Sequence, residues 1–240
     1  MRIPLTKYGW PQVIVFPATM LLVMAIFPIG TIGFLGSRII FVVESILLIV
    51  LIWILTFFRD PHRDCPSDKD LLLAPADGKI TDIEQVDHVD FIEGPALRIG
   101  IFLSLFNTHI NRAPCHVRVE SITYKKGQYR NAMNPQSGRV NESNTLGLVR
   151  TDHPRDRLIL RQVSGAIARR IACDTAEGRE LAPGQKFGML KFGSRTELYV
   201  PVRVDLKCLV RVGDKVKAGL TPLAKYEIQP QPTPGKRRRR

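Results

Sequence analysis

The sequence is poor in cysteine, and its cysteines form no motif. The four, Cys65, Cys115, Cys173 and Cys208, are scattered through 240 residues with no CxxC pair. Their spacing argues against a zinc site and against a dense disulfide framework. We therefore expect no bound metal, and reduced thiols in a cytoplasmic setting.

Acidic residues are also few, with 22 Asp and Glu against 35 Lys and Arg, which gives a formal net charge of +13. Such an excess predicts an anionic partner, either nucleic acid or a lipid surface. The run Lys236 to Arg240 is wholly basic, and basic clusters beside a membrane bind anionic headgroups. The sequence has no helix-turn-helix, zinc-finger or aromatic-interleaved RNA motif. An anionic membrane surface is the predicted partner, and no nucleic acid is expected.

Charge is almost absent from two long stretches near the N-terminus. Val13 to Leu35 contains no charged residue, and Ile39 to Phe58 contains only Glu44. Each run is close to the roughly 20 residues that cross a bilayer. We predict a transmembrane helical hairpin, although Pro17 and Pro28 leave a kinked or re-entrant first segment open. A cleaved signal peptide is disfavoured because the first run is too long and a second follows directly.

Basic residues flank the predicted hairpin on one side. Arg2 and Lys7 precede it, Arg59 and Arg63 follow it, and only Arg38 lies between the two runs. The positive-inside rule then places both ends, and the soluble domain, in the cytoplasm at the cell membrane.

Beyond Phe58 the chain changes to short apolar runs separated by turn residues, a pattern typical of β-strands. Val210 to Ala224 resembles the closing hairpins of biotinyl and lipoyl carrier domains, but lacks their modified lysine. We expect a fold that is mainly β with minor α, in which a membrane anchor (1–58) precedes a barrel-sandwich-like soluble domain (59–232) and a basic disordered tail (233–240). The predicted strands include Leu97 to Leu103, Val117 to Tyr124, Leu158 to Val163, Ala166 to Ala172, Glu197 to Val204 and Leu206 to Val212.

The stretch Arg130 to Asp152 is polar and rich in asparagine. A segment of this length without regular structure in a compact domain is usually functional or mobile. Two interpretations stay open, a flexible lid over a substrate site and a plain surface loop.

Gly193-Ser194 is a bond at which a chain can cut itself. A serine hydroxyl needs a base or strain to attack a carbonyl, and glycine leaves the preceding carbonyl carbon accessible. Attack would give an ester, and β-elimination would leave a dehydroalanine that hydrolyses to a pyruvoyl group at the new N-terminus. A Gly-Ser pair on its own is far more often an ordinary turn.

Five segments give the chain a resemblance to phosphatidylserine decarboxylases, and most closely to the short branch that is processed at a Gly-Ser bond. They follow one another in the family's order along nearly the whole soluble part. The segments are Phe58 to Pro61, Ala74 to Ile80, Phe106 to Pro114, Arg130 to Met133, and the processing motif Gly188 to Pro201.

The resemblance implies a membrane-anchored proenzyme that cuts itself between Gly193 and Ser194. Ser194 would become the covalent pyruvoyl cofactor, which forms a Schiff base with phosphatidylserine, releases CO2 and gives phosphatidylethanolamine for phospholipid biosynthesis. The large and small chains of the proenzyme would stay associated, with a homodimer of such pairs as the expected assembly. A serine hydrolase using Ser194, His109 and Asp77, and a non-catalytic carrier-like membrane domain, are the alternatives.

Candidate site residues come from the matched motifs. Ser194, His109 and Asp77 are the predicted catalytic residues, with His109 as proton carrier and Asp77 as the group that orients and stabilises its imidazole. Without the resemblance, Asp77 would be read as part of an Asp-Gly turn and His109 as an interior histidine. Arg169 and Arg170 are candidates for holding the substrate phosphate or carboxylate, and strand alternation allows at most one of them to do so.

One position departs from the family pattern. The long bacterial branch has two histidines three residues apart in the motif of His109, and here the second position holds Arg112. The base for self-cleavage is therefore either His109 itself or another group. His116 lies nearby in sequence but does not match the motif.

Overall fold

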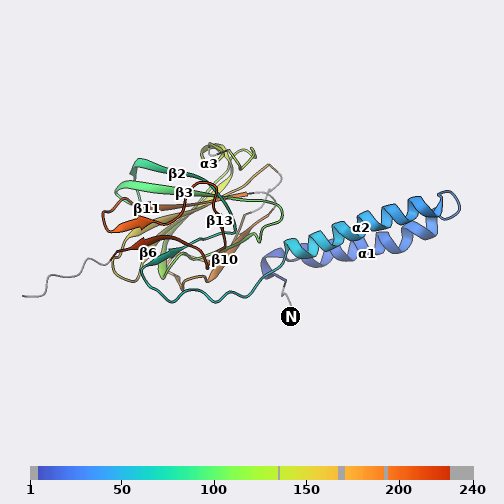
Figure 1. The fold of residues 1–240 in the computed structure, drawn as a ribbon, viewed down its shortest axis with the longest axis horizontal. Helices are drawn as coiled ribbons and strands as arrows, with labels where there is room; N and C mark the ends of the chain where they lie inside the picture. Colours follow the sequence, from blue (N-terminus) through green and yellow to red (C-terminus); the bar gives the residue numbers. More distant parts are fainter. Residues whose placement is uncertain (1–4, 135, 167–170, 192–193, 228–240) are drawn as a thin grey trace, which may run out of the picture.

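The computed structural model describes residues 5–134, 136–166, 171–191 and 194–227. It has two parts, a β domain and a long helical hairpin that projects from it (Figure 1). The predicted basic tail lies outside the described residues.

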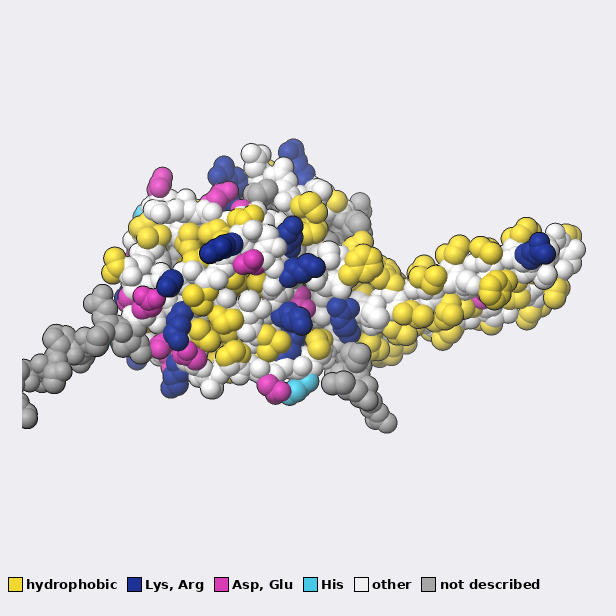
Figure 2. Space-filling view, in the orientation of Figure 1, with side chains coloured by type: hydrophobic (Ala, Val, Ile, Leu, Met, Phe, Trp, Pro, Cys, Tyr) yellow, Lys and Arg dark blue, Asp and Glu magenta, His cyan; other side chains and the backbone are white. Residues whose placement is uncertain are grey.

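The hairpin consists of α1 (Gln12–Thr31) and α2 (Ser37–Phe57), preceded by the 3-10 helix η1 (Lys7–Gly9). Both long helices have the length and composition needed to cross a membrane. The helix α1 is a single element, although it contains Pro17 and Pro28. Its surface and that of α2 are almost wholly apolar in Figure 2. Exposed apolar surface of this extent is compatible with association with a membrane.

Within the described residues the β domain has three sheets, and every pair of strands in them is antiparallel. The largest has the order β13-β2-β3-β11-β7-β6-β5-β9, and the smaller two are β1-β14-β12 and β4-β10-β8. The elements are β1 (Leu71–Leu73), β2 (Gly78–Val89), β3 (Gly94–Leu103), β4 (Ile110–Arg112), β5 (Val117–Lys125), α3 (Ser137–Val140), β6 (Ser143–Arg150), β7 (Arg157–Val163), β8 (Ile171–Cys173), β9 (Glu180–Leu181), β10 (Lys186–Leu190), β11 (Ser194–Pro201), β12 (Leu206–Cys208), β13 (Lys215–Val216) and β14 (Pro222–Tyr226).

Alternation along the strands builds the core. Ile99 and Ile101 of β3 and Leu198 and Val200 of β11 are fully buried in one cluster with side chains from the small β1-β14-β12 sheet. Burial of such side chains stabilises the fold by about 25 cal/mol per Å² of apolar surface. The expected mainly β domain with an N-terminal helical hairpin is confirmed.

The structure corrects the expectation for Arg130 to Asp152, because most of this stretch is ordered secondary structure. It contains α3 and the interior strand β6, which pairs with both β5 and β7. Its polar residues are typical of an exposed loop, but in the structure several of them are buried and hydrogen-bonded to other side chains or to the backbone. The Asn144 side chain donates to Gln162 Oε1 at 3.1 Å, and Asn141 Nδ2 donates to the carbonyl of Ser164 at 2.8 Å.

Other strand predictions hold with shifted ends. The strands β3, β5 and β7 occupy their predicted positions, whereas β11 begins at Ser194, three residues before its predicted start. The predicted strand Leu206 to Val212 ends at Cys208, and the chain then turns at Gly213, whose φ is +103°. Of the predicted strand Ala166 to Ala172, residues 167–170 lie outside the described part, and β8 starts at Ile171.

Candidate active site

Ser194 is the first residue of β11, at the end of the sheet where three strands meet. It pairs with Leu103, and the next row across the sheet joins Arg195 to Phe102 and Phe102 to Lys79. The Ser194 side chain is fully buried. Its Oγ has no hydrogen-bond partner among the described residues. A buried hydroxyl normally finds a partner, and exceptions call for an explanation such as a catalytic role.

Asp77 reaches the same end of the sheet, two residues before Lys79 in β2. The close approach of the chains there requires glycine at position 78, because a Cβ atom would lie 2.1 Å from the carbonyl oxygen of Phe102. The Asp77 carboxylate accepts two hydrogen bonds from Arg63, at 2.6 and 2.7 Å, and one from the backbone N–H of Ala218 at 2.8 Å. Arg63 was not among the predicted site residues, since nothing in the linker sequence indicates a partner for it.

His109 lies between β3 and β4, beside the segment that leads to Ser194. Its carbonyl accepts from the N–H of Leu190 at 3.0 Å, and Ile110 pairs with Met189. The imidazole is fully buried, with Nδ1 2.9 Å from the carbonyl oxygen of Asn107. Because a carbonyl can only accept, Nδ1 carries the proton, and Nε2 is the basic nitrogen of the neutral ring.

Burial lowers the pKa of His109 to about 4, chiefly because a charged imidazolium would lose its hydration. The hydrogen bond to the Asn107 backbone and the negative charge of Asp77 act in the opposite direction, and the positive charge of Arg59 acts with burial. The ring is therefore neutral near pH 7. The influence of Asp77 on His109 is that of a nearby charge, since its described hydrogen bonds go to Arg63 and Ala218.

Arg112, at the second motif position, has a structural place. Its guanidinium donates to the carbonyls of Gly184 and Pro61, at 3.1 and 3.0 Å, and lies 3.6 Å from Asp60. It joins the segment after α2 to the β domain. His116 is exposed and lines a separate small cavity with Cys115 and Asp152.

Arg195 stabilises the start of β11, on the face of the sheet opposite to the Ser194 side chain. It is fully buried, and donates to both oxygens of Asp82 at 2.5 and 2.6 Å and to Glu197 Oε1 at 2.7 Å. Removing one member of a buried ion pair leaves an uncompensated charge and typically costs about 3–5 kcal/mol. This network therefore fixes the backbone directly after Ser194, and it is a second feature that the sequence motif did not reveal.

A buried amide network lies on the face to which Ser194 points. Thr196, two residues along β11 and on the same face, accepts from Asn111 Nδ2 at 3.0 Å, and Gln162 Nε2 donates to Asn111 Oδ1 at 2.9 Å. These bonds hold β11 against β4, the strand that follows His109.

An apolar pocket of about 480 Å³ opens beside the site. Its apolar lining residues are Phe102, Leu105, Phe106, Ala132, Met133 and Ala166. Phe106 is 76% exposed, and its carbonyl accepts from Arg59, directly after α2, at 2.9 Å. The pocket lies at the end of β3, where Phe102 and Ser104 flank Leu103, the partner of Ser194, and its volume is in the usual range for ligand sites.

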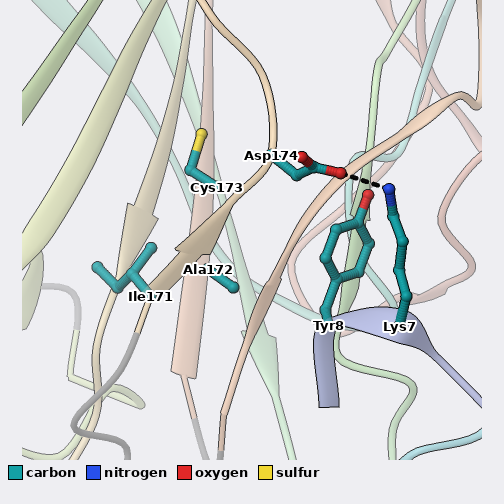
Figure 3. A pocket seen from close by; sticks show the side chains of 6 residues that line it. All are labelled: Lys7, Tyr8, Ile171, Ala172, Cys173 and Asp174. Carbon is teal, nitrogen blue, oxygen red and sulfur yellow. Dashed lines mark hydrogen bonds and ion pairs between the residues drawn. The ribbon is translucent and has the colours of Figure 1, made fainter. Parts of the chain in front are cut away.

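Three predicted residues cannot be placed. Gly193, Arg169 and Arg170 lie outside the described residues. Ile171, the first described residue after the two arginines, lines a second, open pocket of about 490 Å³ with Lys7, Tyr8 and Asp174 (Figure 3).

Comparison with known protein families shows to which family the chain belongs. The sequence model of phosphatidylserine decarboxylases matches residues 50–224. The chain belongs to the phosphatidylserine decarboxylase family. The matched span runs from the last turns of α2 into β14, and so includes Asp77, His109 and Ser194.

Several relatives carry the name phosphatidylserine decarboxylase proenzyme. The protein of Desulfotalea psychrophila is 43% identical over 75% of this chain and 82% of its own length. That of Carboxydothermus hydrogenoformans is 35% identical over 83% and 92%, and that of Symbiobacterium thermophilum is 38% identical over 92% and 95%. Membership of this family implies a decarboxylase, a lyase.

The pKa of His109 links the stability of the chain to pH. In the unfolded chain His109 binds a proton below about pH 6.5, whereas in the folded chain it does so only near pH 4. The neutral, buried His109 therefore adds its full stabilisation of the fold above pH 6.5, and this stabilisation is lost as the pH falls toward about 4. The difference corresponds to about 3 kcal/mol. We expect denaturant unfolding of the Ser194→Ala chain to show this loss, and the Ser194→Ala/His109→Gln chain to lack it. Equal pH dependence in the two would contradict the burial of a neutral ring.

Proposed function

We propose that the chain is a pyruvoyl-dependent phosphatidylserine decarboxylase that cuts itself between Gly193 and Ser194. The observation that carries the proposal is Ser194 itself, fully buried at the start of β11 with an Oγ that has no partner among the described residues. A buried hydroxyl of this kind fits a residue that is to become a group within the site rather than a surface nucleophile.

Self-cleavage begins with Ser194 Oγ attacking the carbonyl carbon of Gly193. The C–N bond breaks as the C–O bond forms, and the hydroxyl proton passes through a base to the released amine. In the β-elimination a base takes the Cα proton of Ser194 and the Cβ–O bond breaks, which leaves a carboxylate on Gly193 and a dehydroalanine. Water replaces its nitrogen, ammonia departs, and the pyruvoyl group remains at the new N-terminus.

His109 is the proposed base that takes the hydroxyl proton of Ser194 during self-cleavage. Its lowered pKa keeps it neutral near pH 7, so it can accept a proton without first losing one. The imidazolium that forms would be stabilised by the charge of Asp77, which Arg63 holds in place through two hydrogen bonds. Arg112 is tied to the linker and to Gly184, so His109 serves both the cleavage and the decarboxylation in this proposal.

A pyruvoyl group supplies a carbonyl that withdraws electrons from an attached amino acid, which permits loss of CO2 without pyridoxal phosphate. The residues around Ser194 fit such a group. The neutral imidazole of His109 would take up a proton at Nε2 during the reaction and deliver it to the product α-carbon, and the buried surroundings exclude bulk water.

The apolar pocket and the hairpin support a lipid substrate. The pocket beside Phe106 would take the glycerol and acyl part of phosphatidylserine, while Arg169 or Arg170 would hold its phosphate or carboxylate. The proposed layout is a membrane anchor (1–58), a decarboxylase domain (59–232) on the cytoplasmic side, and a basic tail (233–240) at the anionic surface. The two chains made by cleavage remain together, as a homodimer of such pairs.

Replacing Ser194 tests the proposed mechanism. The Ser194→Ala chain has no hydroxyl to attack Gly193, so it is expected to stay a single chain and to release no CO2 from phosphatidylserine. A gel of the purified protein and a CO2-release assay measure the two effects. Thr196→Ser, on the same face of β11, is the matched control and should be cut normally. Decarboxylation by Ser194→Ala would refute the mechanism.

Replacing Phe106 tests the proposed lipid pocket. Phe106→Asp puts a carboxylate at the mouth of the pocket, where it disfavours both apolar chains and an anionic lipid. We expect KM for phosphatidylserine in vesicles to rise at least tenfold, with kcat and the extent of self-cleavage little changed. Val204→Asp is the control, because Val204 is 98% exposed beyond the opposite end of β11. Equal KM values for the two variants would show that the pocket does not take the lipid.

A further inference from the structure

The base of the hairpin packs directly against the strand that leads to the cleavage site. Val13 of α1 and Ile54 and Phe57 of α2 form one buried cluster with Phe58 and with Met189 of β10. Met189 is fully buried and lies five residues before Ser194. The helices therefore do more than tether the β domain, since their ends form part of its interior.

Polar contacts fix the same junction. Lys191, two residues before Gly193, is buried and donates to Gln12 Oε1 at the first residue of α1, at 3.0 Å. Ahead of α1, Lys7 reaches Asp174 at 2.5 Å, and the Tyr8 ring lies alongside this ion pair (Figure 3). The N-terminal side of the hairpin is thus held at separate points to the residues that directly follow β8 and β10.

Phe57, the last residue of α2, covers the ring of His109. The ring centroids are 4.5 Å apart with an interplanar angle of 38°, and both side chains are almost completely buried. The charged groups that act on His109 come from other elements, Asp77 from the turn before β2 and Arg59 from the segment after α2. Phe57 adds no charge, so its contribution is to exclude water and to restrict the orientation of the ring.

We propose that Phe57 is a positioning residue for His109, through which the docked membrane hairpin completes the catalytic site. This inference rests on the proposed function for the role of His109, and adds that the anchor is a working part of the enzyme. Without the Phe57 ring, water reaches the imidazole and its neutral form is no longer favoured to the same degree.

A titration of His109 in the uncut Ser194→Ala chain, full length and in detergent, tests the contact without relying on any chemistry. The imidazole signals are followed by NMR, and His109 is assigned by the signal that His109→Gln removes. We expect Phe57→Ala to raise the midpoint by at least one pH unit from about 4 toward 6.5. Phe41→Ala, the same change at a residue of α2 that is 72% exposed, should leave the midpoint unchanged.

The catalytic part is tested in the chain that retains Ser194. The self-cleavage rate falls at low pH when His109 becomes protonated. For Phe57→Ala this fall should begin at a higher pH, by the same amount as the shift of the His109 titration midpoint. A purely structural defect would instead lower the rate equally at every pH. Phe57→Leu, which keeps an apolar cover, should shift both the midpoint and this fall by less, and it takes over the test if Phe57→Ala does not fold. If the midpoint of Phe57→Ala equals that of Phe41→Ala, the inference is overturned. If Phe57→Ala does not fold, the same comparison is made between Phe57→Leu and Phe41→Ala, and equal midpoints again overturn it. A parent chain that is never cut would instead overturn the proposed function.

Discussion

The pairing of β11 with β3 is the constraint on which the site depends. It sets Ser194 opposite Leu103 at the end of the sheet, and the pairing of β3 with β2 brings Asp77 to the same end. Arg195 and its carboxylate partners lock this register from one face, and the Asn111 and Gln162 amides lock it from the other. The backbone directly after Ser194 is therefore held firmly from both faces of the sheet.

The helical hairpin and the β domain form one continuous structure at their junction. The segment after α2 is pinned by Arg59 to Phe106, by Asp60 to Lys186 and by Arg63 to Asp77. Two of these contacts join the hairpin side of the molecule to Asp77 and to the pocket residue Phe106, and the third joins it to the start of β10. The proposed substrate is a lipid, so a rigid junction would keep the distance between the membrane and the reacting group constant.

Sequence patterns predicted the hairpin and the β class because apolar runs and turn residues are local signals. The motifs also indicated Ser194, His109 and Asp77, which the fold brings to one region. The motifs did not reveal β6. Its Asn144 is a residue type common in loops, and the sequence does not show that its side chain is buried and bonded to Gln162. They missed Arg63, Arg195 and Phe57 for the same reason, since each depends on a contact between residues far apart in the sequence or on a strand register that no local pattern encodes.

The central claim is that Ser194 becomes a pyruvoyl group by self-cleavage. The most direct test is the intact mass of the freshly purified wild-type chain in detergent. The account predicts two masses, one of them for residues 194–240 and lower than the mass of that sequence by one ammonia. A single mass for the uncut 240-residue chain, in folded protein, would contradict it.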